Sequence, residues 1–210
     1  MLFVFSLCCN SLFLFGYTLY PDSEGYLLLA KQSITCNEPY PAAEMLRELP
    51  FVWNIAAINM VALSLKLFSS ITPLLLLYTM MKGASAWFVY KISQRIFSDK
   101  TALLALLIYV CYPANHGEST STLSELPFMF FVLSSIYLYQ KNHATAAGVL
   151  LAAANWFRPM ALLFLLVLLV CNRKKIIHAA LSYAISILLI GSSTYIRTSR
   201  FIYQAQTGWM

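Results

Sequence analysis

The chain has 210 residues, of which 60% are hydrophobic and only 10% are charged, and its mean hydropathy is +0.70. Soluble domains carry about 25% charged residues, so this composition excludes an ordinary soluble domain and predicts an all-α, multi-pass membrane protein. The formal net charge of +6 is spread between apolar segments without forming a basic stripe or arm, which argues against nucleic acid as a partner.

The first predicted element is an uncharged apolar stretch from Leu2 to Tyr20, which is long enough to enter a bilayer. It lacks the basic start and small-residue cleavage site of a signal peptide, so we expect an uncleaved membrane helix. The motif Pro21-Asp22-Ser23-Glu24-Gly25-Tyr26 follows directly, with a helix expected over 24–33. Carboxylates at a membrane boundary are candidates for function, because charges are costly there.

Residues 51–68 are apolar but carry Asn54, Asn59 and Lys66, and they can be read in two ways. As a membrane span, they would invert the orientation of every later loop. We favour an amphipathic helix at the outer interface, with Trp53 as an interfacial anchor.

The rest of the chain divides into further apolar segments at the length expected of membrane helices, which brings the prediction to about seven. They cover residues 71–90, 101–114, 123–140, 143–157, 159–171 and 176–196. Residues 143–171 could also form one kinked span, but we expect a hairpin that breaks at Arg158-Pro159, because proline disfavours helix at the residue before it.

Lys and Arg accumulate in cytoplasmic connections, and this rule sets the expected topology. The basic connections contain Lys91, Arg95 and Lys100, then Lys141, then Arg173-Lys174-Lys175. With a cytoplasmic N-terminus all three connections face the cytoplasm, and every acidic residue except Asp99 lies on the outer side. No P-loop, HExxH or GxSxG motif occurs, so any chemistry must use carboxylates and isolated basic groups.

Three motifs in this order resemble the GT-C glycosyltransferases: Pro21-Asp22-Ser23-Glu24-Gly25-Tyr26, Ser124-Glu125-Leu126-Pro127-Phe128 and Asn155-Trp156-Phe157-Arg158-Pro159. The likeness is to members related to protein O-mannosyltransferases, aminoarabinose transferases and GPI mannosyltransferases. It implies a hexosyltransferase that moves a sugar from a polyprenyl-phosphate donor to a glycan, lipid or protein acceptor on the non-cytoplasmic side. Residues 1–210 would form one transmembrane domain, the N-terminal part of a longer module, in a bacterial plasma membrane or, in a eukaryote, the endoplasmic reticulum membrane.

Inverting sugar transfer needs a base for the acceptor hydroxyl, and the resemblance assigns this role to Asp22. The structural alternative for Asp22 is a helix N-cap. Glu24 would orient the acceptor, or hold a divalent metal together with Asp22, whereas the helix dipole alone also favours a glutamate in a first turn. Tyr26, one turn after Asp22, would help to hold the sugar or the lipid phosphate.

The leaving phosphate needs positive charge, and Arg158 is the candidate, with snorkelling to lipid headgroups as its alternative. Glu125 matches the Ser-Glu of the family and is preferred to Glu118 as a binding residue. Lys82, inside the span over 71–90, is expected to form a structural pair or to snorkel.

Two rival functions stay open. One is a small transporter or flippase subunit, whose passage Lys82 and the short paired spans would line, and the other is a noncatalytic membrane partner.

Overall fold

The structure is a computed structural model that describes residues 20–48, 52–112, 118, 120–171 and 173–203. Every element in these residues is a helix, which confirms the all-α fold class for the part described. The helix predicted over Leu2–Tyr20 lies outside these residues except for Tyr20. The elements are α2 (Pro21–Thr35), α3 (Met45–Glu48), α4 (Ile55–Phe68), α5 (Thr72–Ile96), α6 (Asp99–Cys111), α8 (Glu125–Gln140), α9 (Ala144–Phe157), η1 (Pro159–Leu163), α10 (Phe164–Cys171), η2 (Arg173–Lys175) and α11 (Ile176–Thr198).

Local chemistry explains several helix ends. Pro21 begins α2, where its fixed φ suits a helix and its missing N–H costs nothing. Ser98 caps α6, because its Oγ accepts a hydrogen bond from the backbone N–H of Thr101 at 3.3 Å. Ser69 and Ser199 end α4 and α11 in the left-handed conformation, which closes the last helical turn.

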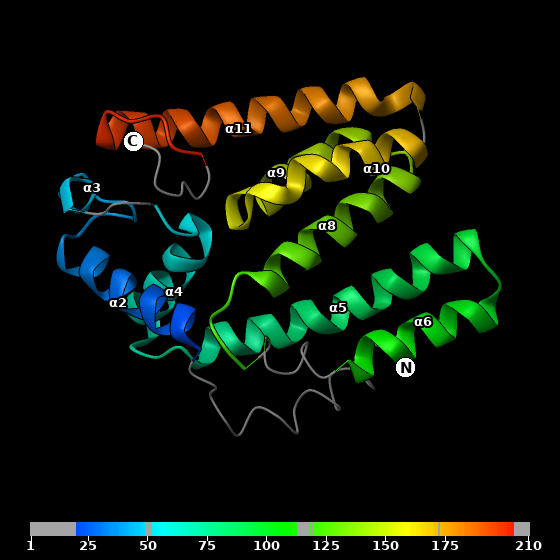
Figure 1. Cartoon of the computed structure of the whole chain (residues 1–210), viewed down its shortest axis with the longest axis horizontal. Helices are drawn as coiled ribbons and strands as arrows, with labels where there is room; N and C mark the ends of the chain where they lie inside the picture. Colours follow the sequence, from blue (N-terminus) through cyan, green and yellow to red (C-terminus); the bar gives the residue numbers. More distant parts are fainter. Residues whose placement is uncertain (1–19, 49–51, 113–117, 119, 172, 204–210) are drawn as a thin grey trace.

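The long helices form one bundle, and α2, α3 and α4 gather at one of its ends (Figure 1). Within the bundle, α8 packs against α9 and α5, α9 packs against α11, and α5 packs against α6. Successive helices run in opposite directions, so their connections alternate between the two ends. Helix α4 packs against α2, α5 and α9, and it thereby joins the small end group to the bundle.

The connections sort by charge between the two ends of the bundle. The turns between α5 and α6, α8 and α9, and α10 and α11 lie together at the right of Figure 1, and they are the three basic connections. Helices α2 and α3 and the start of α8, which carry four of the eight acidic residues, lie at the opposite end. The fold thus places the basic connections at one end of the bundle and the acidic segments of α2, α3 and α8 at the other end.

Fewer helices meet the requirements of a membrane span than the sequence predicts. Within the described residues, α11 alone is both long and apolar enough to cross a bilayer. Its 23 residues reach about 34 Å, whereas the 14 residues of α9 reach about 21 Å against a hydrocarbon core of about 30 Å. The predicted segments are helices, but a bundle of seven full-length spans is not supported.

The predicted break at Arg158-Pro159 is confirmed. Helix α9 ends at Phe157, and Arg158 adopts an extended conformation (φ −146°, ψ 135°) before Pro159 begins η1. The clash between a proline ring and a preceding helical residue explains this conformation. The chain turns back here, and the side chain of Arg158 reaches Ser124 and Glu125 at the start of α8.

Helices α9 and α11 approach closely at Gly148. A Cβ atom added there would lie 2.1 Å from the carbonyl oxygen of Ala179 and 2.1 Å from Ser182 Oγ. Ser182 also donates a hydrogen bond to the carbonyl of Thr145 at 2.9 Å, which ties the two helices at this point. A residue larger than glycine would push the two backbones apart.

We therefore expect Gly148→Ala to destabilise the protein by about 1–3 kcal/mol, although alanine favours helix by about 1 kcal/mol over glycine. Gly191→Ala is the matched control, because the three atoms nearest its Cβ all belong to the partly exposed side chain of Phe201 and none to a backbone. The measurement is the unfolding free energy of both variants in detergent micelles. Equal stability of the two variants would contradict the close contact between α9 and α11.

Candidate active site

Five side chains from four separate segments form a hydrogen-bonded group that we call the polar cluster: Tyr26, Asn54, Ser124, Glu125 and Arg158. Asn54 Nδ2 donates to the hydroxyl of Tyr26 and, at 3.0 Å, to Ser124 Oγ. Arg158 Nε donates to the same Ser124 Oγ at 3.2 Å, and Arg158 Nη2 forms an ion pair with Glu125 Oε1. Residues up to 132 positions apart in the sequence, from 26 to 158, therefore meet at one point.

Helix ends supply most of this cluster. Asn54 precedes α4, Ser124 and Glu125 stand at the start of α8, and Arg158 follows the last residue of α9. Tyr26 comes from the second turn of α2, and its ring packs edge-on against Trp53, with ring centroids 5.6 Å apart. Trp53, predicted as an interfacial anchor, thus contacts the cluster.

Ser124 links the two halves of the polar cluster. Its buried oxygen accepts hydrogen bonds from Asn54 and Arg158, and its hydroxyl lies 3.5 Å from Glu125 Oε2. A buried oxygen with two donors is well satisfied, and it fixes the orientation of both donors. Ser124 therefore positions the guanidinium of Arg158.

Arg158 keeps donors available for a ligand. Its side chain is 33% exposed and that of Glu125 is 28% exposed, so the ion pair borders solvent. The described contacts engage Nε and Nη2, and within the described residues no acceptor is bound to Nη1. The planar guanidinium can hold Glu125 on one edge and offer its remaining N–H groups to an anion.

The two carboxylates of the first motif lie outside the cluster. Asp22 and Glu24 are both exposed in the first turn of α2, ahead of Tyr26. Burial raises the pKa of the Tyr26 hydroxyl, hydrogen bonds from Ser124 and Asn54 oppose this, and the negative charges of Glu125 and Asp22 raise it further. Asp22 is therefore close enough to influence the cluster. N-capping is not the role of Asp22, because it lies inside the helix and the cap position is Tyr20.

Two further charged residues belong to this region, and the sequence reasoning gave them little weight. Burial raises the pKa of the Glu118 carboxyl, and nearby Glu125 raises it further, while the positive charges of Arg158 and Lys82 lower it. Lys82 of α5 is completely buried. Glu118 therefore lies beside the cluster rather than free in a loop. In the sequence, their place as a carboxylate and a lysine in apolar surroundings was the feature that could have identified both residues as part of the site.

The structure brings together three of the five predicted site residues, Tyr26, Glu125 and Arg158, while Asp22 lies outside their hydrogen-bonded group. Glu24 is exposed on α2. In the part of the chain that the structure describes, no group of three or more His, Cys, Asp or Glu side chains could hold a metal ion. In the sequence, Asn54 was noted only as a polar residue in an apolar stretch, and Ser124 only as the residue before Glu125 in the second motif.

Comparison with known proteins adds no relative: no family model, no curated protein and no solved structure matches the chain.

Proposed function

We propose that the protein is a membrane glycosyltransferase, mannosyltransferase-like, that transfers a sugar from a polyprenyl-phosphate donor to an acceptor at the non-cytoplasmic face. The observation that carries this proposal is the polar cluster. Tyr26, Glu125 and Arg158 come from the three separate motifs of the GT-C resemblance, and they meet at one end of the bundle beside Asp22.

A location in the membrane is supported by the apolar residues on the surface. Large hydrophobic side chains are exposed along α6, α10 and α11, and Val170 and Ile196 are 85% and 82% exposed. A water-soluble monomer rarely exposes apolar residues over so wide an area, whereas lipid contact makes it favourable. We propose that α11 crosses the bilayer, that the shorter apolar helices enter it, and that the basic turns face the cytoplasm.

In the proposed reaction Asp22 accepts the proton of an acceptor hydroxyl. The hydroxyl oxygen then bonds to the anomeric carbon while the bond from that carbon to the phosphate oxygen breaks. The phosphate leaves with the bonding electron pair, and Arg158 stabilises its negative charge through the donors that Glu125 and Ser124 leave unused.

The remaining residues of the site have supporting roles in this proposal. Glu125 orients the guanidinium of Arg158 through the ion pair, in place of the direct binding role that the sequence predicts for it. Tyr26, with its raised pKa, keeps its proton and offers a hydroxyl to the sugar or the phosphate. Glu24 stays a candidate for contact with the acceptor. A divalent metal held by Asp22 and Glu24 would need ligands from the substrate, because two carboxylates fill few coordination positions.

One observation favours the rival function, a small transporter or flippase subunit. Lys82 is completely buried in α5, among the helices of the bundle. A buried charge in a membrane helix marks an ion or substrate pathway by default. In the glycosyltransferase, the same lysine would act through its electrostatic effect on Glu118.

One experiment separates the two functions. Sealed vesicles that contain the protein receive a radiolabelled polyprenyl-phosphate mannose and a mixture of membrane lipid and peptide acceptors. The proposed function predicts a new covalent sugar product whose formation needs the protein. Movement of labelled lipid between leaflets without any product, lost on Lys82→Met, would instead establish the transporter.

A further inference from the structure

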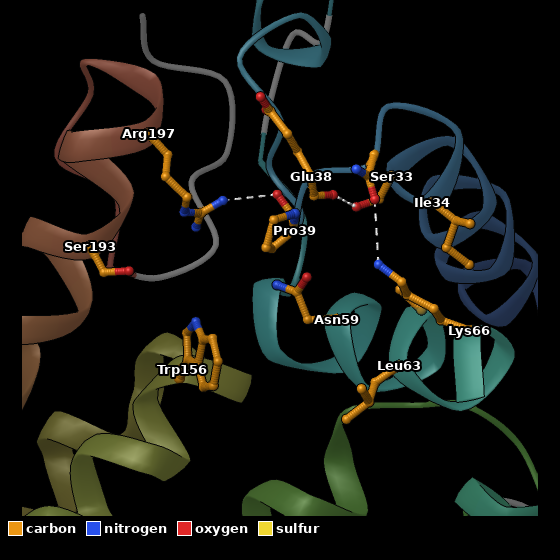
Figure 2. Close-up of a pocket in the computed structure, with 12 residues that line it drawn as sticks. Ser33, Ile34, Glu38, Pro39, Asn59, Leu63, Lys66, Trp156, Ser193 and Arg197 are labelled. Atoms are coloured by element: carbon orange, nitrogen blue, oxygen red, sulfur yellow. Dashed lines mark hydrogen bonds between the residues drawn. The ribbon is translucent and has the colours of Figure 1, made fainter. Parts of the chain in front are cut away.

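A cavity of about 460 Å³ lies between α2, α4, the end of α9 and the end of α11 (Figure 2). None of the five residues of the polar cluster lines it. Its chemistry depends on six lining residues, Asn37, Leu63, Lys66, Trp156, Ser193 and Arg197. We call it the cationic cavity, and the glycosyltransferase proposal gives it no role.

Two positive charges face each other across this cavity. Figure 2 shows Arg197 on one side and Lys66 on the opposite side. Arg197 Nη1 donates to the carbonyl of Pro39 at 3.0 Å, which fixes the guanidinium and leaves its other nitrogens available. Lys66 Nζ is 3.4 Å from Asn37 Oδ1, which is a weak hydrogen bond for an ammonium group. Neither contact neutralises its cation, because both acceptors are uncharged.

The acidic residue of the lining does not balance these charges. Among the described lining residues, Glu38 alone is acidic, and its Oε2 accepts the backbone N–H of Ala43 at 3.3 Å. Figure 2 shows its carboxylate turned away from the space between Lys66 and Arg197. The cavity therefore has a net positive charge and suits an anion.

A buried donor lacks an acceptor at the same place. The indole Nε1 of Trp156 is inaccessible to solvent and has no hydrogen-bond partner within the described residues. Figure 2 shows the edge of the ring that carries this nitrogen turned toward Asn59 and Arg197. A buried N–H without an acceptor is unfavourable by about 1–3 kcal/mol, so a movement of this side chain that let it meet a ligand oxygen would be favoured.

An apolar groove shares one lining residue with the cavity. Leu63 also lines a smaller groove of about 130 Å³ between α4 and α5, whose other lining residues are Met60, Ser64, Leu67, Phe68, Pro73, Leu74 and Leu77. All but Ser64 are hydrophobic. Leu63 and Leu67 are both largely exposed, so an aliphatic chain can lie along this face of α4.

We propose that the cationic cavity and the apolar groove together bind an amphiphile with a phosphate headgroup. The phosphate lies between Lys66 and Arg197, and the hydrocarbon chain passes Leu63 into the groove. Phosphate fits because it has several acceptor oxygens and no need of an acceptor from the protein, and arginine binds it through two N–H groups. This proposal does not depend on sugar transfer, because binding can be measured without any reaction.

The test is equilibrium binding to the purified protein in a nonionic detergent. The probes are dioctanoyl phosphatidic acid, farnesyl phosphate, dioctanoyl phosphatidylcholine and inorganic phosphate. We expect saturable binding of at least one of the first two, and a loss of affinity of about tenfold or more in Lys66→Gln and in Arg197→Gln. Arg197→Lys should retain more affinity than Arg197→Gln. Trp156→Phe, which keeps the ring and removes the N–H, should weaken binding about fivefold.

Lys31→Gln is the matched control, because Lys31 is an exposed lysine of α2 that does not line the cavity. It should bind as the wild type does. Tighter binding of phosphatidic acid or of farnesyl phosphate identifies the source of the ligand, and either supports the proposal. Equal binding of phosphatidylcholine or of inorganic phosphate would overturn it, as would unchanged affinity in folded Lys66→Gln and Arg197→Gln variants.

Discussion

Asp22→Asn is expected to abolish sugar transfer while the protein still inserts into membranes. Asparagine keeps the size of aspartate but cannot accept a proton from the acceptor hydroxyl. A general base contributes about 10²- to 10⁴-fold to a rate, so the loss should be of that size. Because the side chain is exposed in the first turn of α2, its replacement should change stability little. The measurement is the initial rate of product formation at saturating donor, with membrane-inserted protein quantified in the same preparation.

Glu44→Gln is the matched control for this result. Glu44 is an exposed glutamate outside the polar cluster, and its replacement loses the same charge. A loss of transfer in Asp22→Asn but not in Glu44→Gln would separate a base from a general effect of negative charge near the membrane. Unchanged transfer in Asp22→Asn would remove Asp22 from the mechanism and leave Glu118, with its raised pKa, as the carboxylate to test.

The positions of the helices could be predicted because hydropathy and helix-breaking residues are local signals. The predicted segment over 143–157 became Ala144–Phe157, and Pro159 fixed its end. Whether each helix spans a membrane could not be predicted as well, because this depends on how the length of the helix compares with the thickness of the bilayer. Short helices such as α9 have apolar residues throughout but lack that length.

The candidate site could be predicted only in part, because it is assembled from distant segments. Arg158 and Glu125 drew attention as charges beside apolar helices, and their ion pair agrees with that reasoning. Two uncharged members, Asn54 and Ser124, could not be found in this way. Asn54 and Ser124 resemble ordinary polar residues at helix starts, and their importance comes from hydrogen bonds between residues 70 positions apart.

The surroundings of Lys82 show the same limit. A lysine in an apolar segment permits either snorkelling toward the membrane edge or a place inside the bundle. The choice depends on which face of α5 meets α8, and the sequence does not define that packing. The structure buries Lys82 completely, close enough to Glu118 to lower its pKa against the effect of burial.

Arg158→Gln is expected to reduce sugar transfer by about 100-fold or more, because the leaving phosphate would lose its charged donor. Arg158→Lys should recover only part of the rate, since a lysine cannot contact Glu125 and a phosphate with a planar fork of donors. Stability should fall much less than activity. The ion pair is about one-third exposed, and such pairs contribute only about 0–1 kcal/mol to folding.

Arg173→Gln provides the control for loss of positive charge, because Arg173 is exposed in the turn at the opposite end of the bundle. It should transfer sugar at the wild-type rate.

Glu125→Gln distinguishes a positioning role from direct binding. If Glu125 only orients Arg158, the double variant with Arg158→Gln should be no slower than Arg158→Gln alone, since the loss of the arginine removes what Glu125 acts upon. Additive losses of activity in the double variant would contradict a role of Glu125 that acts only through its ion pair with Arg158.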